Sequence, residues 1–329
     1  MVRRNVLNYA NRSRFLRVLR SHVRALSIPL DQQVLIVGGS VDDEAVLRHA
    51  GFTRIVNSNL PSDISRITNG KPGICESHAT IDVEQMDLPD ESFDLVFAHA
   101  VLHHCRSPHR ALCEMLRVSR KYVIFLEPND SLAMSALVRL RFSFPYELFA
   151  VADHDYRSGG VRDSAIPNFI YRWSKWEVSK TISSFLPERA FSVRTYPYWD
   201  FSMPENELAM RTETRIGSVT SVLGVRNFMS ALRVLGTALN WVPVLRKQGN
   251  KFFCCVEKGR GLKSWLMRDG NTIVFNREFG RRKDPAHRPF VKPGGKPDIS
   301  SRDVAMREVD DTSREGPPVP GVSRPRTAG

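Results

Sequence analysis

Short apolar runs alternate along this chain with segments whose apolar residues recur at helical spacing. Four of the runs are four or five residues long and are bounded by Gly, Pro, Asn or acidic residues, which is typical of strands buried on both faces. These runs are Val34–Val37, Arg54–Asn57, Leu95–Ala98 and Tyr122–Leu126. The helical segments lie between them, so the pattern predicts an α/β fold with a doubly wound, mostly parallel sheet.

The helix boundaries carry their own signals. Asp42-Asp43-Glu44 opens the helix after the first strand, where acids interact favourably with the positive end of the helix. Ser107-Pro108 predicts an N-cap and a first helical residue, and Ser174 with Glu177 has the spacing of a capping box. A strand at Phe191–Tyr196, a helical region at about 205–246 and a last strand at Phe252–Glu257 complete the expected domain.

We expect four parts along the chain. Residues 1–29 form a basic N-terminal helix, residues 30–260 the main domain, residues 261–280 a C-terminal extension and residues 281–329 a disordered tail. The tail holds eight of the 20 Pro residues and has almost no apolar spacing. Inside the main domain, residues 128–173 are too long for an ordinary connection and are rich in aromatics, which indicates a helical and aromatic lid.

The net charge of +13 is concentrated at the two ends. Residues 1–24 carry seven Arg and no acid, and residues 281–329 carry 11 Lys or Arg against 7 Asp or Glu, so residues 25–280 hold 13 − 7 − 4 = +2. A basic arm can contact nucleic acid or an anionic membrane surface. Because residues 1–24 hold only two aromatics, Tyr9 and Phe15, and no nucleic-acid motif, nucleic acid is disfavoured, while a weak membrane-surface contact and a simple solvated helix face both stay open.

The five Cys residues form no C-x-x-C pair and no Cys/His metal spacing, so no metal is expected. They indicate reduced thiols and a cytoplasmic location. Residues 1–24 lack the apolar core of a signal peptide, and no apolar run is long enough for a transmembrane segment.

The most informative stretch runs from Asp82 to His104. An acid opens it, a Leu-Pro-Asp turn follows, and Asp94 leads into an apolar strand and then a His pair. This order resembles the second half of a class I S-adenosylmethionine-dependent methyltransferase of the methyltransferase type 11-like family. The resemblance implies a Rossmann-like fold with a seven-stranded sheet, and S-adenosylmethionine as the cofactor.

The resemblance implies that the loop after the first strand passes close to the cofactor. Here that loop keeps Gly38 and Gly39 but lacks the later glycine of the family pattern, and Gly-Gly is also typical of a plain tight turn. Asn59 stands where the family has an acid on the ribose hydroxyls, although it also suits a turn. The acids at residues 42–44 would repel a pyrophosphate, so the loop suits the positively charged S-adenosylmethionine better than a dinucleotide.

The remaining cofactor residues also follow from the resemblance. It implies that Asp82 accepts a hydrogen bond from the adenine amino group and that the backbone N–H of Val83 meets the ring. Ala98 and His99 end the third strand, where open α/β sheets bind ligands, and are expected beside the methionine end of the cofactor.

Methyl transfer to a hydroxyl needs a general base, for which His103, His104 and His154 are the candidates. Structural packing of the His pair and an exposed loop position for His154 are the alternatives. The leading hypothesis is O-methylation of a small-molecule, glycan or lipid-linked acceptor. A methyltransferase-like protein that binds without catalysing, and a nucleic-acid methyltransferase using the basic arms, are the rivals.

Overall fold

The apolar runs form the strands of one seven-stranded sheet, and each strand extends beyond its apolar centre. The computed structural model describes residues 14–60, 78–147, 160, 166–201 and 215–279. The strands of the sheet are β1 (Gln33–Val37), β2 (Arg54–Asn59), β3 (His78–Thr80), β4 (Phe93–His99), β5 (Ser119–Pro128), β6 (Arg189–Tyr198) and β7 (Lys251–Leu262). The six predicted strands are therefore present, and the short edge strand β3 adds the seventh.

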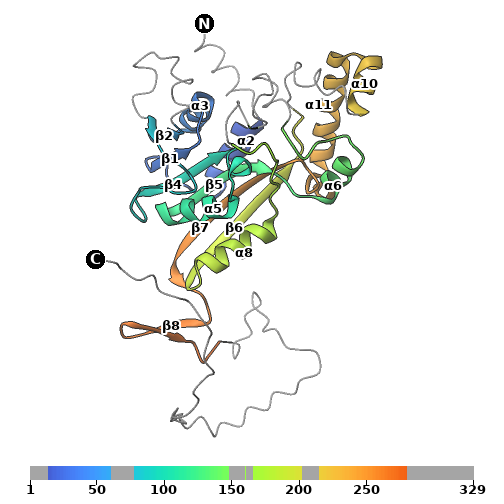
Figure 1. Cartoon of the computed structure of the whole chain (residues 1–329). Helices are drawn as coiled ribbons and strands as arrows, with labels where there is room; N and C mark the ends of the chain where they lie inside the picture. The colour runs from blue at the N-terminus through green and yellow to red at the C-terminus, as the bar shows by residue number, and fades with distance from the viewer. Residues whose placement is uncertain (1–13, 61–77, 148–159, 161–165, 202–214, 280–329) are drawn as a thin grey trace, which may run out of the picture. The chain divides into compact units, whose positions relative to one another are not determined.

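The strand order is β3-β2-β1-β4-β5-β7-β6, which confirms the doubly wound sheet (Figure 1). The pairs from β3 to β5 are parallel, and β7 runs antiparallel to both β5 and β6. The chain passes from β1 to β2 on one side and returns to place β4 on the other. Because the strand order reverses between β1 and β4, their carboxyl ends form the edge at which such sheets bind ligands.

Successive residues of each strand point to opposite faces of the sheet, and each face has its own core. On one face, Val34 and Ile36 of β1 pack with Leu16 and Leu19. On the other face, Leu35 of β1 lies in a second cluster that also contains the aromatic residues Phe125 and Trp173. The sheet is thus buried on both sides, as its continuous apolar runs predict.

The described residues also form helices, several of which contribute to these two cores. They are α2 (Arg14–Ala25), α3 (Val41–Ala50), the short 3-10 helix η1 (Leu102–His104), α5 (Pro108–Val118), α6 (Leu132–Arg139), α8 (Lys175–Phe185), α10 (Arg215–Leu223), α11 (Val225–Trp241) and α12 (Pro243–Arg246). The basic helix α2 shares a core with β1 and β4 through its buried residues Leu16 and Leu19. Of the region expected to be helical at about 205–246, residues 205–214 lie outside the described residues, and the helices of the rest are divided at Gly224 and at Val242.

Ser107 and Ser174 are the N-cap residues of α5 and α8, as predicted, but the hydrogen bonds around both caps differ from those expected. The Ser107 side chain makes no capping hydrogen bond; instead, the Glu84 carboxylate accepts the backbone N–H groups of Arg106 and Ser107. Ser174 does cap α8 by accepting from the Glu177 N–H, but the Glu177 carboxylate accepts from the Tyr171 hydroxyl rather than completing a capping box.

The expected lid, residues 128–173, is described in part. It contains α6 and an isolated antiparallel bridge between Tyr146 and Phe169, and Trp173 pairs with Asn129 beside the sheet. The expected extension at 261–280 forms the hairpin β8 (Leu266–Asp269) and β9 (Thr272–Phe275), which the sequence pattern did not predict.

The chain divides into two units, residues 1–277 and residues 278–329. The predicted disordered tail, 281–329, lies outside the described residues and stays a prediction. Among the helices of the described ranges, none combines the length and the apolar character needed to cross a membrane.

Candidate active site at the carboxyl edge of the sheet

The loop after β1 keeps its two glycines for steric reasons. Gly38 has a φ of +60°, and a Cβ there would lie 2.7 Å from the methyl groups of Val101 in the segment after β4. The Gly39 N–H donates to the carbonyl of Ser58, and a Cβ on Gly39 would lie 2.2 Å from the Asn57 side-chain oxygen. The loop is therefore packed closely between β2 and β4.

A complete capping box, which the sequence analysis missed, begins α3. The Asp43 carboxylate accepts from the backbone N–H and the hydroxyl of Ser40, at 2.8 and 2.6 Å, while Ser40 Oγ accepts the Asp43 N–H. The other carboxylate oxygen of Asp43 lies 2.6 Å from Nδ1 of His99, at the end of β4. Burial alone would raise the pKa of Asp43, but the charge and hydrogen bond of His99 and the bonds from Ser40 lower it.

The contact between His99 and Asp43 changes the interpretation of His99 and of the acids at residues 42–44. His99, expected beside the methionine end of the cofactor, holds Asp43 and stacks on Phe15 of α2 with ring centroids 4.5 Å apart. Two of the three acids of the loop are paired, Asp43 with His99 and Glu44 with Arg48.

Asn59 lies at the end of β2, as predicted, and its side chain makes two local bonds. Nδ2 donates to the carbonyl of Gly39 at 3.2 Å, and Oδ1 accepts the N–H of Leu60 at 2.8 Å. Asn59 therefore ties the Gly loop to β2, and a ribose hydroxyl would have to exchange with one of these bonds. Ala98 is fully buried in the core, so its side chain is not at the surface of the site.

Asp82 and Val83 lie at the same edge, just beyond β3. The N–H of Ile81 donates to the carbonyl of Asn59, which places the Asp82 turn beside the end of β2. Asp82 is exposed, and one of its carboxylate oxygens accepts the Glu84 N–H at 2.9 Å. Val83 is buried in the second core, which holds the backbone of this turn in place.

His103 of η1 is buried against a carboxylate that the sequence analysis did not single out. Its Nδ1–H donates to Glu127 Oε2 at 2.5 Å, and the other oxygen of Glu127 accepts the N–H groups of Val101 and Leu102, each at 2.8 Å. Burial lowers the pKa of His103, but the charge and hydrogen bond of Glu127, helped by Glu147, outweigh it and raise that pKa to about 9. Although burial favours the neutral acid, His103 and these backbone bonds also keep the pKa of Glu127 below its usual range.

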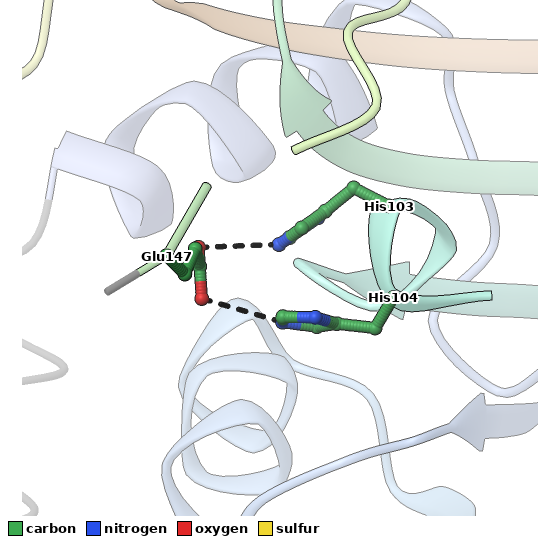
Figure 2. A group of neighbouring side chains, drawn as sticks. All are labelled: His103, His104 and Glu147. Atoms are coloured by element: carbon green, nitrogen blue, oxygen red, sulfur yellow. Dashed lines mark ion pairs between the residues drawn. The ribbon is translucent and has the colours of Figure 1, made fainter. Parts of the chain in front are cut away.

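The lid segment supplies a second carboxylate to the His pair (Figure 2). Glu147 Oε1 lies 3.3 Å from Nε2 of His103, and Glu147 Oε2 lies 3.5 Å from Nε2 of His104. The Nδ1–H of His104 donates to the carbonyl of Pro167, which also belongs to the lid. Burial and the neighbouring charge on His103 lower the pKa of His104, so this imidazole is neutral at pH 7.

The structure thus brings two of the three predicted base candidates together, and His154 lies outside the described residues. The ligand atoms of His103, His104 and Glu147 all lie within 4.8 Å of one another, a spacing that a metal ion could also use. His103 lies between the carboxylates of Glu127 and Glu147, so its positive charge can hold the cluster together without a metal ion. The expectation that no metal is needed stays a prediction.

Comparison with known proteins agrees with this geometry. Residues 54–126, from β2 to β5, match the family described as "Methyltransferase domain". The match begins after the Gly loop, the part in which the chain departs from the usual pattern. The sheet order and the matched segment both resemble those of the class I S-adenosylmethionine-dependent methyltransferases.

Solved structures of this fold are similar to the chain at low identity. Magnesium protoporphyrin IX methyltransferase from Synechocystis PCC 6803, solved with bound SAH, is 15% identical; the likeness covers 58% of this chain and 78% of that one, with a TM-score of 0.38. The YcgJ protein from Bacillus subtilis is 13% identical, over 74% and 97% of the two chains, with a TM-score of 0.42. A SAM-dependent methyltransferase from Archaeoglobus fulgidus is 11% identical, over 74% and 94%, with a TM-score of 0.39. No curated protein matches the chain, and at these TM-scores no property of the similar structures is transferred to it.

Proposed function

We propose that this chain is a methyltransferase that uses S-adenosylmethionine to methylate a hydroxyl group. The observation that carries the proposal is the convergence of the predicted residues at one edge of the sheet. The Gly38-Gly39 loop, Asn59, the Asp82 turn and the His pair follow β1, β2, β3 and β4 in turn. That edge includes the reversal point between β1 and β4, where ligands bind in this fold.

The groups at this edge fit a cationic cofactor without phosphates. Gly38 leaves room that a Cβ would fill, and the acids Asp42 and Asp82 are not matched by a basic residue in the Gly loop or in the Asp82 turn. A pyrophosphate would be repelled there, whereas a sulfonium and an ammonium would be attracted. On the proposal, Gly38 and Gly39 lie along the methionine part.

The other cofactor contacts continue along the edge. Asn59 forms hydrogen bonds with the ribose hydroxyls, while Asp82 and the Val83 N–H form hydrogen bonds with the adenine. His99 and the backbone of Ala98 border the methionine end. His99 acts there as a positioning residue, since its Nδ1 is bound to Asp43.

The bound cofactor supplies an activated methyl group on a positively charged sulfur, so the protein must orient the acceptor and exclude water. An acceptor hydroxyl also has to lose its proton. His103 already carries a proton at pH 7, because it lies between Glu127 and Glu147. His104 is neutral and less buried, so it is the described candidate that can accept a proton.

The acceptor is proposed to be a small molecule, a glycan or a lipid-linked intermediate that enters beside the lid. Glu147 and Pro167 bring the lid segment to the His pair, which supports a lid that borders the acceptor. His154 belongs to the same segment and remains the alternative base.

Calorimetric titration with S-adenosylmethionine and with its demethylated product tests the cofactor half of the proposal. A dissociation constant in the micromolar range is expected, and no binding at about millimolar cofactor would end the enzyme interpretation. That outcome would favour the rival of a methyltransferase-like protein that binds or assembles without catalysing.

A matched pair of variants tests the base. His104→Gln should lower methyl transfer by about 10²-fold or more without weakening cofactor binding, since a base contributes to turnover. His109→Gln is the control. His109 also pairs with a carboxylate, since its Nε2 lies 3.3 Å from Glu177 Oε1, but it belongs to α5 and not to the His pair of η1. Equal activity of the two variants would remove His104 from the mechanism.

The alternative hypothesis, that the chain is a nucleic-acid methyltransferase, needs a test that preserves the fold. Deleting residues 1–24 would remove buried core residues such as Leu16 and Leu19, so loss of binding after deletion would be uninformative. Replacing the exposed Arg17 and Arg24 of α2 by Gln changes charge alone. Loss of RNA or DNA binding in that variant would favour the rival.

A further inference from the structure

Helices α10 to α12 expose several large apolar side chains. Val222 of α10 is 84% exposed, Val234 and Trp241 of α11 are 71% and 83% exposed, and Val244 of α12 is 70% exposed. Further exposed apolar residues in the same segment are Leu223, Leu235, Val242 and Leu245. We call these eight side chains the apolar helical surface. Single exposed apolar residues are common, but eight within 24 residues of chain, on helices that contact one another in sequence order, are typical of an interaction surface.

The opposite side of α11 is held firmly on the domain. Met229 and Gly236 are buried, and a Cβ on Gly236 would lie 2.8 Å from the ring of Phe201. The Asn240 side chain exchanges two hydrogen bonds with the backbone of Trp199, and the Trp199 indole N–H donates to the carbonyl of Leu245. The apolar helical surface is therefore presented by an anchored element rather than by a loose one.

The charge around this surface has one sign. Residues 215–250 contain five basic residues and no acid: Arg215, Arg226, Arg233, Arg246 and Lys247. Helix α2 also has no acid and exposes Arg17 and Arg24, whereas its Arg20 donates to the carbonyl of His49 in α3. The two segments adjoin, because Arg17 and Ser21 of α2 line the same hollow as Thr237 and Trp241 of α11.

We propose that this face lies on a lipid bilayer with anionic headgroups, with the apolar side chains of α10–α12 inserted and the basic residues of α11, α12 and α2 at the headgroups. A helix with Trp, Leu and Val on one side and Arg nearby is the pattern of an interfacial helix that lies in the plane of a membrane. A second copy of this chain is disfavoured as the occupant, because the basic residues around its apolar helical surface would face those of the first copy. Nucleic acid is disfavoured because eight apolar side chains would face its phosphates.

Sedimentation with lipid vesicles tests this proposal without cofactor or acceptor, so its failure and that of the methyltransferase proposal are distinguishable. The full chain should bind vesicles of phosphatidylcholine mixed equally with phosphatidylglycerol at least about tenfold more tightly than vesicles of phosphatidylcholine alone, since each Arg near an anionic surface adds roughly a fivefold gain. Added salt should weaken the binding, because it screens the charges.

Variants then assign the binding to α11. Val234→Asp and Trp241→Ser should each reduce partitioning onto the anionic vesicles by about tenfold or more, since one inserts a charge and the other removes the largest apolar side chain. Trp176→Ser is the matched control, because Trp176 is 78% exposed on α8, outside the proposed face. It should bind as the unaltered chain does.

Several outcomes would overturn the proposal. The unaltered chain could fail to sediment with anionic vesicles, or it could bind both vesicle types equally. Equal losses in the α11 variants and in Trp176→Ser would show that the binding is not specific to this face. A dimer that Val234→Asp dissociates, in a chain that does not bind vesicles, would assign the surface to self-association instead.

Discussion

The carboxylate of Glu127 is the most consequential charge in the candidate site, and Glu127→Gln isolates its effect. The side chain is buried at the end of β5 and accepts two backbone N–H groups in addition to pairing with His103. The amide oxygen of Gln can keep the two backbone bonds, but its NH₂ group would then face the Nδ1–H of His103. Breaking a buried pair in this way costs about 3–5 kcal/mol, and because the backbone bonds survive we expect about 3 kcal/mol.

The stability lost in Glu127→Gln should depend on pH, because the pKa values of both Glu127 and His103 are shifted in the folded chain. The pKa of Glu127 is lowered in the folded chain, so its contribution is present above the ordinary value of 4.5 and is lost as the pH falls through the folded value. The pKa of His103 is raised from 6.5 to about 9, so its contribution is complete below pH 6.5 and is lost as the pH rises through about 9. The stability difference should therefore be greatest between about pH 4.5 and 6.5.

Urea unfolding of both proteins from pH 4 to pH 10 measures this difference. Glu257→Gln is the control, because Glu257 is a half-exposed strand residue that lies 3.8 Å from Lys121 and should lose less than about 1 kcal/mol. A Glu127→Gln loss below about 1 kcal/mol, or one that stays constant from pH 6 to pH 10, would refute the buried ion pair.

Other predictions concern the cofactor edge, the lid and the tail. Asp82→Ala should weaken S-adenosylmethionine binding by about 1–3 kcal/mol in calorimetry, the effect of an unpaired adenine donor; an unchanged dissociation constant in the folded variant would remove Asp82 from the site. Gly38→Ala should lower both thermal stability and cofactor affinity, because the added methyl meets Val101 and the positive φ is strained; a variant as stable and as tightly binding as the parent would contradict this. His154→Ala should reduce turnover while cofactor affinity stays within about twofold, and unaltered turnover would make it an ordinary loop residue. Removing residues 281–329 should leave the melting temperature and cofactor affinity unchanged, whereas a large drop would show that the tail docks.

The backbone of the fold could be predicted because its signals are local. Each of the runs at Val34–Val37 and Leu95–Ala98 forms a buried strand, and the length and polarity of the segments between them permit parallel pairing. Asp82 also lies beside the end of β2, at the sheet edge where the resemblance implies that the cofactor binds. Strands β3 and β8 were missed because they are three or four residues long and hold at most two large apolar residues, and β9 was missed because its apolar run, Ile273–Phe275, is only three residues long.

The site contacts could not be predicted because they join distant parts of the chain. Asp43 and His99 are 56 residues apart, and nothing local indicates that the acid at a helix start pairs with the residue ending another strand. Glu127 could have been suspected, since a carboxylate at the end of an apolar strand must be paired when buried. Glu147 gave no comparable signal, because it lies in a lid segment without a repeating pattern.

Helix α2 joins two surfaces that the sequence presents as unrelated. Arg17 borders the hollow shared with α11, while Phe15, two residues earlier, stacks on His99, which in turn holds the Asp43 cap of the Gly loop. If both proposals hold, a bilayer that shifts α2 would change the free energy of the Gly loop through this series of contacts. Thermodynamic linkage makes this coupling mutual: whatever factor a membrane adds to the affinity for S-adenosylmethionine, the cofactor adds to the affinity for the membrane.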